Sequence, residues 1–116
     1  MRRHGRALRA VKIEMLYFDG CPSHDALLPR LREIVAELDA QADIELRHIE
    51  TFDQAEQERF LGSPTVRIDG ADIEPAAAER TDFGLKCRLY HSADGASGLP
   101  PEQWLRNAID KARATA

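Results

Sequence analysis

The chain has 116 residues, a length at which globular chains usually form one domain around a single core. Its composition, 43% apolar and 31% charged residues, excludes a disordered, collagenous or membrane chain and is ordinary for a folded globular protein. The formal net charge is −4, and the two cysteines are too few to hold a small fold together through disulfides.

The basic residues are unevenly distributed along the chain. Four of the 16 lie in the first ten residues, where no acid occurs: Arg2, Arg3, Arg6 and Arg9. The other 12 stand against 20 acidic residues, so the rest of the chain carries a charge of −8. Because phosphate binding requires clustered Lys and Arg, we expect no nucleic-acid partner. We expect residues 1–10 to be a flexible basic tail, with an anion-binding arm as the alternative.

The distribution of apolar residues along the chain indicates the cellular compartment of the protein. No stretch approaches the ~18 apolar residues of a membrane span, and residues 11–14 alternate with charge where a secretory signal would stay apolar. We therefore expect a cytoplasmic protein without a membrane partner. In that reducing compartment an isolated thiol is more often a buried small hydrophobe, a nucleophile or a ligand than half of a permanent disulfide.

The first two elements have clear periodicity. Alternating apolar and charged residues predict a strand over 11–18, ended by Asp19-Gly20. From Pro22 to about Asp39, apolar residues recur every three or four positions, which predicts a helix with one buried face. That face comprises Leu27, Leu28, Leu31, Ile34, Val35 and Leu38. Pro29 inside the helix should bend it.

The next elements are shorter. Residues 44–49 predict a second strand, although the alternation is weak. Residues 53–61 predict a short helix that Asp53 would cap and Gly62 would end.

A hairpin and a final helix follow. The residues 65–68 and 72–74 predict two antiparallel strands joined by the two-residue turn Asp69-Gly70. Proline suits a first helical turn, so the last helix should begin at Pro101, with Trp104 in the core.

This order of elements predicts an α/β fold: a mixed sheet with helices on both faces, in a single domain over residues 11–116. Residues 76–99 are left over as an insertion before the last helix. They contain one strand-like piece, Lys86 to His91.

The position of Cys21 affects the ionisation of its thiol. Cys21 follows the first strand directly and opens the first helix in the order Cys21-Pro22-Ser23-His24. Unpaired amides and the positive end of the helix dipole favour a thiolate there. The pKa of a cysteine at such a position can fall from ~8.5 to between roughly 3.5 and 7.5. Cys21 is therefore a candidate nucleophile or soft-metal ligand.

A second signal is Ser63-Pro64, an X-Pro peptide that immediately precedes the third strand. Together with the cysteine at the helix start and the βαβ unit, it resembles the thioredoxin-like family over about residues 11–75 and 101–114. The resemblance implies a three-layer sandwich with a mixed four-stranded sheet flanked by helices. It also implies that Cys21 attacks a disulfide or electrophile and that Pro64 is a cis-proline packed against its sulfur.

The same resemblance implies a substrate site. Ser63 would offer its backbone to an extended substrate, and Pro22 and Pro64 would flank it. The partners would be protein or small-molecule thiols and disulfides, and no cofactor is expected beyond a thiol reductant such as glutathione.

The fourth motif position departs from the family, because His24 stands where thioredoxins carry a resolving cysteine. Two-thiol chemistry is therefore absent from the motif, which is closer to monothiol relatives. His24 could stabilise the Cys21 thiolate as an imidazolium or relay its proton. The alternative is a solvated histidine at the end of the helix.

The second cysteine, Cys87, is constrained by topology. The strand that pairs with the third strand must end beside Cys21, so the insertion should start at that end of the sheet. Cys87 could then be a resolving thiol, provided that the two Cα atoms lie within roughly 7 Å. Alternatively, the alternation of Cys87 with Arg88 and Tyr90 makes Cys87 an inward-facing small hydrophobe.

Cys87 could also be a metal ligand. The pairs Cys21-x-x-His24 and Cys87-x-x-x-His91 have zinc-like spacing. An extended segment would separate Cys87 from His91 by about 13 Å at ~3.3 Å per residue, too far to share one ion. A two-thiolate site for a soft ion stays open.

These observations predict a thiol–disulfide oxidoreductase in which Cys21, His24 and Cys87 are the candidate catalytic residues. One alternative is a non-catalytic module that binds a soft metal or organometal through Cys21 and Cys87. Another is a thioredoxin-fold domain for protein interaction.

Overall fold

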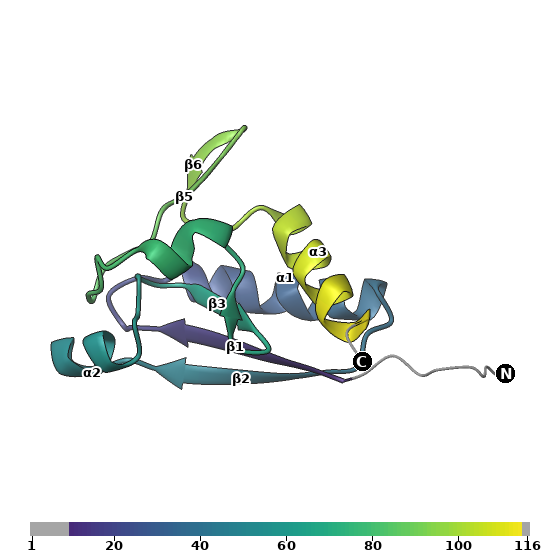
Figure 1. Cartoon of the computed structure of the whole chain (residues 1–116), viewed down its shortest axis with the longest axis horizontal. Coiled ribbons are helices and arrows are strands. Elements are labelled where there is room, and N and C mark those ends of the chain that lie inside the picture. Colours follow the sequence, from purple (N-terminus) through teal and green to yellow (C-terminus); the bar gives the residue numbers. More distant parts are fainter. Residues whose placement is uncertain (1–9, 115–116) are drawn as a thin grey trace, which may run out of the picture.

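The structure is a computed structural model that describes residues 10–114 (Figure 1). The predicted basic tail, residues 1–10, lies outside the described part except for Ala10. In chain order the elements are β1 (Val11–Tyr17), α1 (Ser23–Glu37), β2 (Ala42–His48), α2 (Phe52–Gln57), β3 (Thr65–Ile68), β4 (Ala71–Asp72), the 3-10 helix η1 (Pro75–Glu79), β5 (Tyr90–Ser92), β6 (Gly95–Ser97) and α3 (Glu102–Ala114).

The predicted mixed four-stranded sheet is confirmed, with strand order β2-β1-β3-β4. The central strand β1 pairs in parallel with β2 and antiparallel with β3. In the antiparallel pair Leu16 lies opposite Thr65, so the end of β1 and the start of β3 share one edge. This register brings Cys21, which follows β1, to the same end of the sheet as Pro64, which precedes β3.

Alternation along β1 divides its side chains between two cores. Val11, Ile13 and Met15 belong to the larger core, which also contains side chains from α1 and α3. Figure 1 shows these two helices on the same side of the sheet. Leu16 belongs to a smaller core with Ile49, Ala55 and Phe60 next to α2. The helix α2 contributes Ala55 to this smaller core, and Figure 1 shows α2 beyond the ends of β1 and β2, so the prediction of helices on both faces is wrong for the face opposite α1 and α3.

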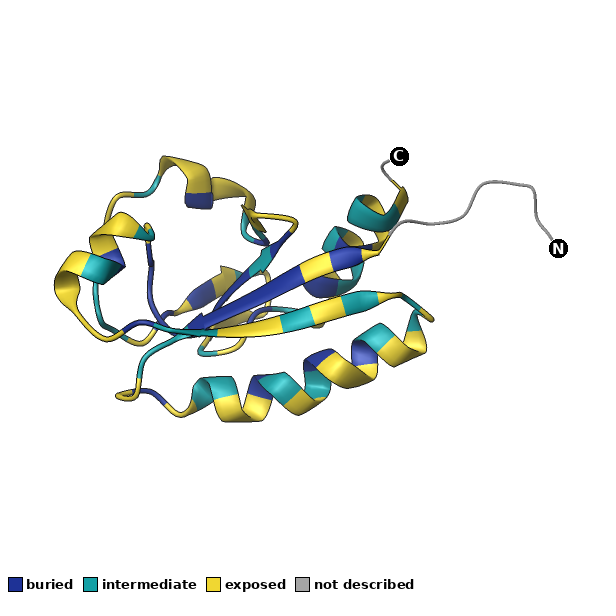
Figure 2. Ribbon diagram, turned by 90° about the horizontal axis from the view of Figure 1, so that it is seen from below, coloured by how far each residue is buried: buried dark blue, intermediate teal, exposed yellow. Residues whose placement is uncertain are grey.

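The central position of β1 is visible in its burial. Figure 2 shows β1 buried over most of its length, whereas the edge strand β2 and the outer side of α1 are partly exposed. On the face away from α1, Glu14 of β1 is largely buried beneath the Arg47 side chain from β2, which bonds it at 3.1 Å. Arg47 also pairs with Glu58 at 2.6 Å. Ion pairs therefore cover Glu14 on this face of the sheet.

Most of the predicted helices and strands begin and end close to the bounds in the structure, and α2 is the main exception. Its N-cap is Thr51, whose side chain accepts a hydrogen bond from the Gln54 N–H at 3.0 Å. The prediction of Asp53 as the cap was wrong, because Asp53 lies within the first turn. The helix also ends earlier than predicted, at Gln57, and Arg59 then takes a φ of 54°.

The insertion differs more strongly from expectation. Residues 90–97 form the β5–β6 hairpin, and Cys87 makes an isolated parallel bridge to Ser63. The alternation was predicted correctly but its direction was wrong: Arg88 and Tyr90 are buried, whereas Cys87 and Leu89 are exposed. Cys87 is therefore not an inward-facing small hydrophobe, because Arg88 occupies the interior.

Trp104 holds a more peripheral place than the predicted core position. It is half-buried and packs edge-on against Tyr90, with ring centroids 6.4 Å apart. Among residues 10–114, no helix combines the length and the apolar character needed to cross a membrane.

Candidate functional site

Cys21 lies in the short connection between β1 and α1 and is 3% exposed. The N-cap of α1 is Pro22, which makes no side-chain capping bond, so the first amides of the helix are left for another acceptor. The Cys21 sulfur takes that place: the Ser23 backbone N–H donates to it, and the Ser23 hydroxyl lies 3.6 Å away.

The surroundings of Cys21 favour its thiolate. Burial alone would raise the pKa of Cys21. Hydrogen bonds from the Cys87 thiol, the Ser23 N–H and the Ser23 hydroxyl outweigh burial and lower the pKa below its ordinary value. The environment of Cys21 therefore shifts its ionisation towards the thiolate, and Cys87 contributes to this shift.

Cys87 reaches Cys21 because its backbone is held against Ser63. The Ser63 N–H donates to the Lys86 carbonyl at 2.8 Å, and the Arg88 N–H donates to the Ser63 carbonyl at 2.9 Å. This pairing brings the Cys87 side chain close to Cys21, and its interaction with Cys21, together with burial, raises the pKa of Cys87. Both cysteines are free thiols.

The loop before β3 is shaped to receive this segment. Gly62 has a φ of +122°, which L side chains rarely adopt, and a Cβ atom there would lie 3.0 Å from the Lys86 carbonyl and from the Arg88 Cβ. The Ser63–Pro64 bond that follows is cis, as the resemblance implied for Pro64. Gly62 therefore allows residues 86–88 to approach the loop closely.

Arg88 anchors the segment from inside. Its side chain is fully buried, and its guanidinium makes two bonds to Asp72, at 2.8 and 3.0 Å, and one to Glu74 at 2.7 Å. It also bonds the Thr65 hydroxyl and lies 4.5 Å over the Tyr90 ring. A buried guanidinium with this many acceptors is held in one orientation.

Tyr90 adds a second anchor. Its hydroxyl donates to the Pro64 carbonyl, and burial raises its pKa above the ordinary phenol value. Arg88 and Tyr90, which both follow Cys87, thus tie the insertion to the start of β3 next to the Cys87–Ser63 bridge.

His24 contacts Cys21 through the backbone. Its Nδ1–H donates to the Cys21 carbonyl at 3.0 Å, and its Nε2 lies 3.3 Å from the Asp25 carboxylate. The ring stacks on Tyr17 with centroids 4.2 Å apart. In this geometry His24 holds the turn that carries Cys21, and the groups that stabilise the sulfur belong to Cys87 and Ser23.

Ser63 lies at the centre of the site, but its backbone is not open to a substrate. Both its N–H and its carbonyl are taken by residues 86–88, which run where the resemblance would place an extended substrate. Its hydroxyl is fully buried and has no hydrogen-bond partner within the described residues 10–114. The expectation that Ser63 offers its backbone to a substrate is therefore wrong for this conformation.

A metal site with four ligands is not assembled. Within residues 10–114 no group of three or more His, Cys, Asp and Glu side chains could hold a metal ion. His91 lies in β5, beyond the Cys87 bridge, and His24 is directed at the Cys21 carbonyl. Of the four residues in the zinc-like pattern, Cys21 and Cys87 are the two that lie close to each other.

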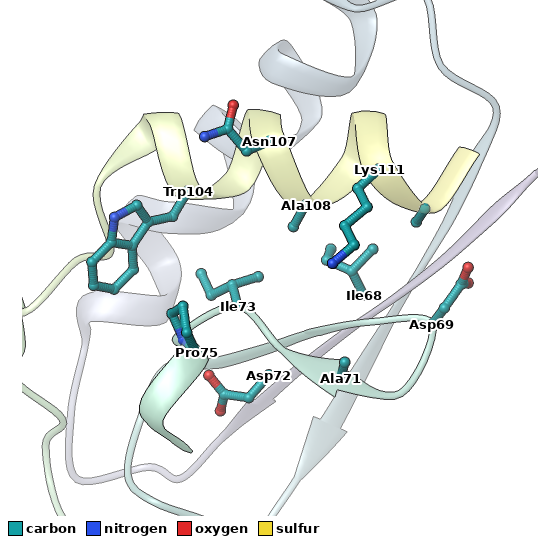
Figure 3. Close-up of a pocket in the computed structure, with 11 residues that line it drawn as sticks. Ile68, Asp69, Ala71, Asp72, Ile73, Pro75, Trp104, Asn107, Ala108 and Lys111 are labelled. Atoms are coloured by element: carbon teal, nitrogen blue, oxygen red, sulfur yellow. The ribbon is translucent and has the colours of Figure 1, made fainter. Parts of the chain in front are cut away.

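Two cavities differ in their relation to this site. A cavity of about 380 Å³ borders Cys87 and is lined by Leu61, Glu74, Arg80, Lys86, Cys87, Arg88, Leu89 and His91. A larger groove of about 650 Å³ lies between α3 and the β3–β4 hairpin, with Trp104 at one end and Lys111 towards the other (Figure 3). The larger groove does not reach either cysteine.

The residues that sequence reasoning missed are Ser23, Arg88 and Tyr90. The position of Ser23 two residues after Cys21 could have signalled its role, since amides and hydroxyls at a helix start face the preceding residue. Arg88 carried no such signal, because its partners Asp72 and Glu74 lie on a distant segment.

The assignment of this site depends on its geometry. No protein-family model matches the chain, and neither a curated protein nor a solved structure is significantly similar to it.

Proposed function

We propose that this protein is a thioredoxin-like thiol–disulfide oxidoreductase whose redox-active pair is Cys21 and Cys87. The observation that carries the proposal is the pairing of Cys87 with Ser63, which brings a second free thiol to the end of the sheet where Cys21 opens α1. The interaction between the two cysteines lowers the pKa of Cys21 and raises that of Cys87. An acidic thiol beside a neutral one is the arrangement from which an intramolecular disulfide forms.

The architecture supports the thioredoxin-like part of the proposal. A central strand leads into the cysteine at the start of α1, and the antiparallel β3 begins at the same edge of the sheet. The first and last helices share one face of the sheet, and on the opposite face Leu16 packs with Ala55 of α2. This arrangement agrees with the resemblance found over residues 11–75 and 101–114.

The second cysteine changes the expected chemistry from a single motif thiol to a pair. When the Cys21–Cys87 bond forms, the pair loses two electrons and two protons, and a substrate disulfide takes them up as two thiols. The insertion supplies the partner that the motif lacks at His24.

Catalysed exchange tests the proposal. Catalytic amounts of the protein should accelerate the reduction of a small disulfide by glutathione, and Cys21→Ser and Cys87→Ser should each abolish the acceleration. Ser92→Ala, in the exposed β5–β6 hairpin, is a control that should keep full activity. A wild-type rate equal to that of Cys21→Ser would refute the proposed function.

The same pair of sulfurs favours a second candidate, a two-thiolate site for a soft ion. Thiolates select ions such as Cu(I), and two sulfurs without a third ligand suit linear coordination. Stoichiometric Cu(I) uptake that is lost in Cys87→Ser, together with no acceleration of disulfide exchange, would favour this function over the first.

A further inference from the structure

The two sulfurs of the proposed pair differ in access. Cys21 is 3% exposed, and Ser23 beside it is itself approached by Gly98, where a Cβ atom would lie 3.1 Å from the Ser23 hydroxyl. Cys87 is exposed. A molecule that arrives from solvent therefore meets Cys87 first.

The cavity beside the site opens on Cys87 as well. Its lining includes Cys87 but not Cys21. Its volume of about 380 Å³ lies at the small end of the range for small-molecule sites, ~300–1,000 Å³. Leu61 and the exposed Leu89 give it apolar walls, and the charged side chains in its lining are paired: Arg80 with Glu74 and Asp82, and Lys86 with Asp82. The space next to the exposed sulfur is suited to a small ligand.

The site is less suited to a protein substrate than to a small ligand. An extended peptide would need free backbone groups at the edge of the sheet to pair with. At Ser63 those groups already bond Lys86 and Arg88, and the buried Arg88 side chain holds them in place. The closed backbone and the cavity both point to a low-molecular-weight partner.

We infer that the oxidised protein is reduced by a low-molecular-weight thiol that binds in the cavity beside Cys87 and attacks the Cys87 sulfur, with Cys21 as the leaving group. This inference rests on the proposed function, because it requires the Cys21–Cys87 disulfide. It reverses the order that the helix-start position of Cys21 suggests, since the thiol of the insertion becomes the one that exchanges with solvent.

The steps balance as follows. The thiolate RS⁻ attacks the Cys87 sulfur, the Cys21–Cys87 bond breaks, and Cys21 leaves as a thiolate stabilised by the Ser23 N–H and hydroxyl. A thiol of lower pKa leaves faster, so breaking the bond in this direction is favoured. A second RS⁻ then attacks the sulfur of R in the mixed disulfide. It releases RSSR and a Cys87 thiolate, which takes a proton from water.

The direct test maps the mixed disulfide. Wild-type protein with the Cys21–Cys87 bond formed is mixed with glutathione, quenched in acid at short times, and digested for peptide mass spectrometry. Glutathione should be found on the peptide that contains Cys87, with Cys21 free. Glutathione on Cys21 would overturn the inference while leaving the proposed function intact. Failure to form the Cys21–Cys87 disulfide in the first place would overturn both.

Single-cysteine variants provide a second measurement that does not require the intermediate to accumulate. At a pH where both thiols are ionised, Cys21→Ser should react with glutathione disulfide at Cys87 roughly tenfold faster than Cys87→Ser reacts at Cys21, because access then decides the rate. The two rates should converge in denaturant. Equal rates in the folded variants would contradict the inferred difference in access.

The size of the partner is tested with two thiols of matched pKa, one free and one attached to a bulky polymer. The free thiol should reduce the oxidised protein several-fold faster, since the polymer cannot enter the cavity. Equal rates would show that the cavity does not select the partner and would favour a protein reductant.

Discussion

The environments of the two cysteines are built in opposite ways. Cys21 is placed by neighbours in the sequence: the end of β1, the start of α1 and Ser23. Cys87 is placed by contacts with distant residues, through the bridge to Ser63 and the Arg88 side chain bonded to Asp72. Cys21 is buried with a lowered pKa, and Cys87 is exposed with a raised one.

This difference teaches that the two halves of the pair can be disturbed separately. Changes around Arg88 should displace Cys87 while leaving Cys21 at the start of its helix. Changes around Ser23 should alter the ionisation of Cys21 while leaving the two sulfurs together.

Arg88→Met should have the largest effect. It leaves the Asp72 carboxylate in a partly buried site without its guanidinium and leaves Glu74 with Arg80 alone, and breaking such a pair typically costs about 3 kcal/mol. Urea unfolding would measure the loss, and the rate of Cys21–Cys87 disulfide formation should fall as well. Arg106→Met in α3 is the control, since Arg106 makes partly exposed ion pairs with Glu37 and Glu102 that are worth less than about 1 kcal/mol. Equal behaviour of the two variants would contradict the anchoring role of Arg88.

Gly62→Ala should have the next largest effect. The backbone strain at its positive φ should cost about 1–3 kcal/mol. The added Cβ should also push residues 86–88 away from the loop. Gly95→Ala is the control, because Gly95 also has a positive φ, +108°, but has open space where its Cβ would lie. Both variants should lose stability in urea, and only Gly62→Ala should form the disulfide more slowly. Slower formation in both would assign the effect to backbone strain alone.

Ser23→Ala should change ionisation and not position. Without the Ser23 hydroxyl the pKa of Cys21 should rise towards its ordinary value, although the backbone N–H bond remains. The pH dependence of Cys21 alkylation, followed in Cys87→Ser with and without Ser23→Ala, reports this rise. Because the pKa of Cys21 is lowered in the fold, its contribution to stability is present at alkaline pH and lost as the pH falls through the folded value. An unchanged alkylation profile would exclude the hydroxyl as a source of the lowered pKa.

Thr51→Ala should leave the cysteine pair untouched. It removes the side-chain cap of α2 and should cost about 1 kcal/mol in urea unfolding. Asp53→Ala should cost less, because Asp53 lies in the first turn and makes only a dipole contribution. Disulfide formation should proceed at the wild-type rate in both. A larger loss of stability for Asp53→Ala than for Thr51→Ala would show that Asp53 caps α2, as the sequence predicted.

The contrast between the two cysteines also explains which features of the structure the sequence could predict and which it could not. The elements around Cys21 follow from periodicity, and topology alone brought the insertion to the same end of the sheet as Cys21. The inward direction of Arg88 could not be predicted, since a buried guanidinium is stable only where acceptors such as Asp72 and Glu74 meet it. The alternation of residues 86–91 was visible, but nothing local decided which side faced the core.

The closing of the Ser63 backbone could not be predicted for the same reason. A loop before a strand is open to a peptide unless another segment of the chain pairs with it. The segment that does so, residues 86–88, is joined to the loop by two backbone bonds rather than by a sequence motif.

The bond between Cys21 and Cys87 is most directly tested by peptide mapping of the mildly oxidised protein. After free thiols are alkylated and the protein is digested without reduction, mass spectrometry should find the peptides of Cys21 and Cys87 joined in stoichiometric yield in a monomer. Arg88→Met, treated in the same way, should give a lower yield. If both cysteines of the wild-type protein are instead recovered alkylated, or joined only between molecules, the two thiols do not form a redox pair.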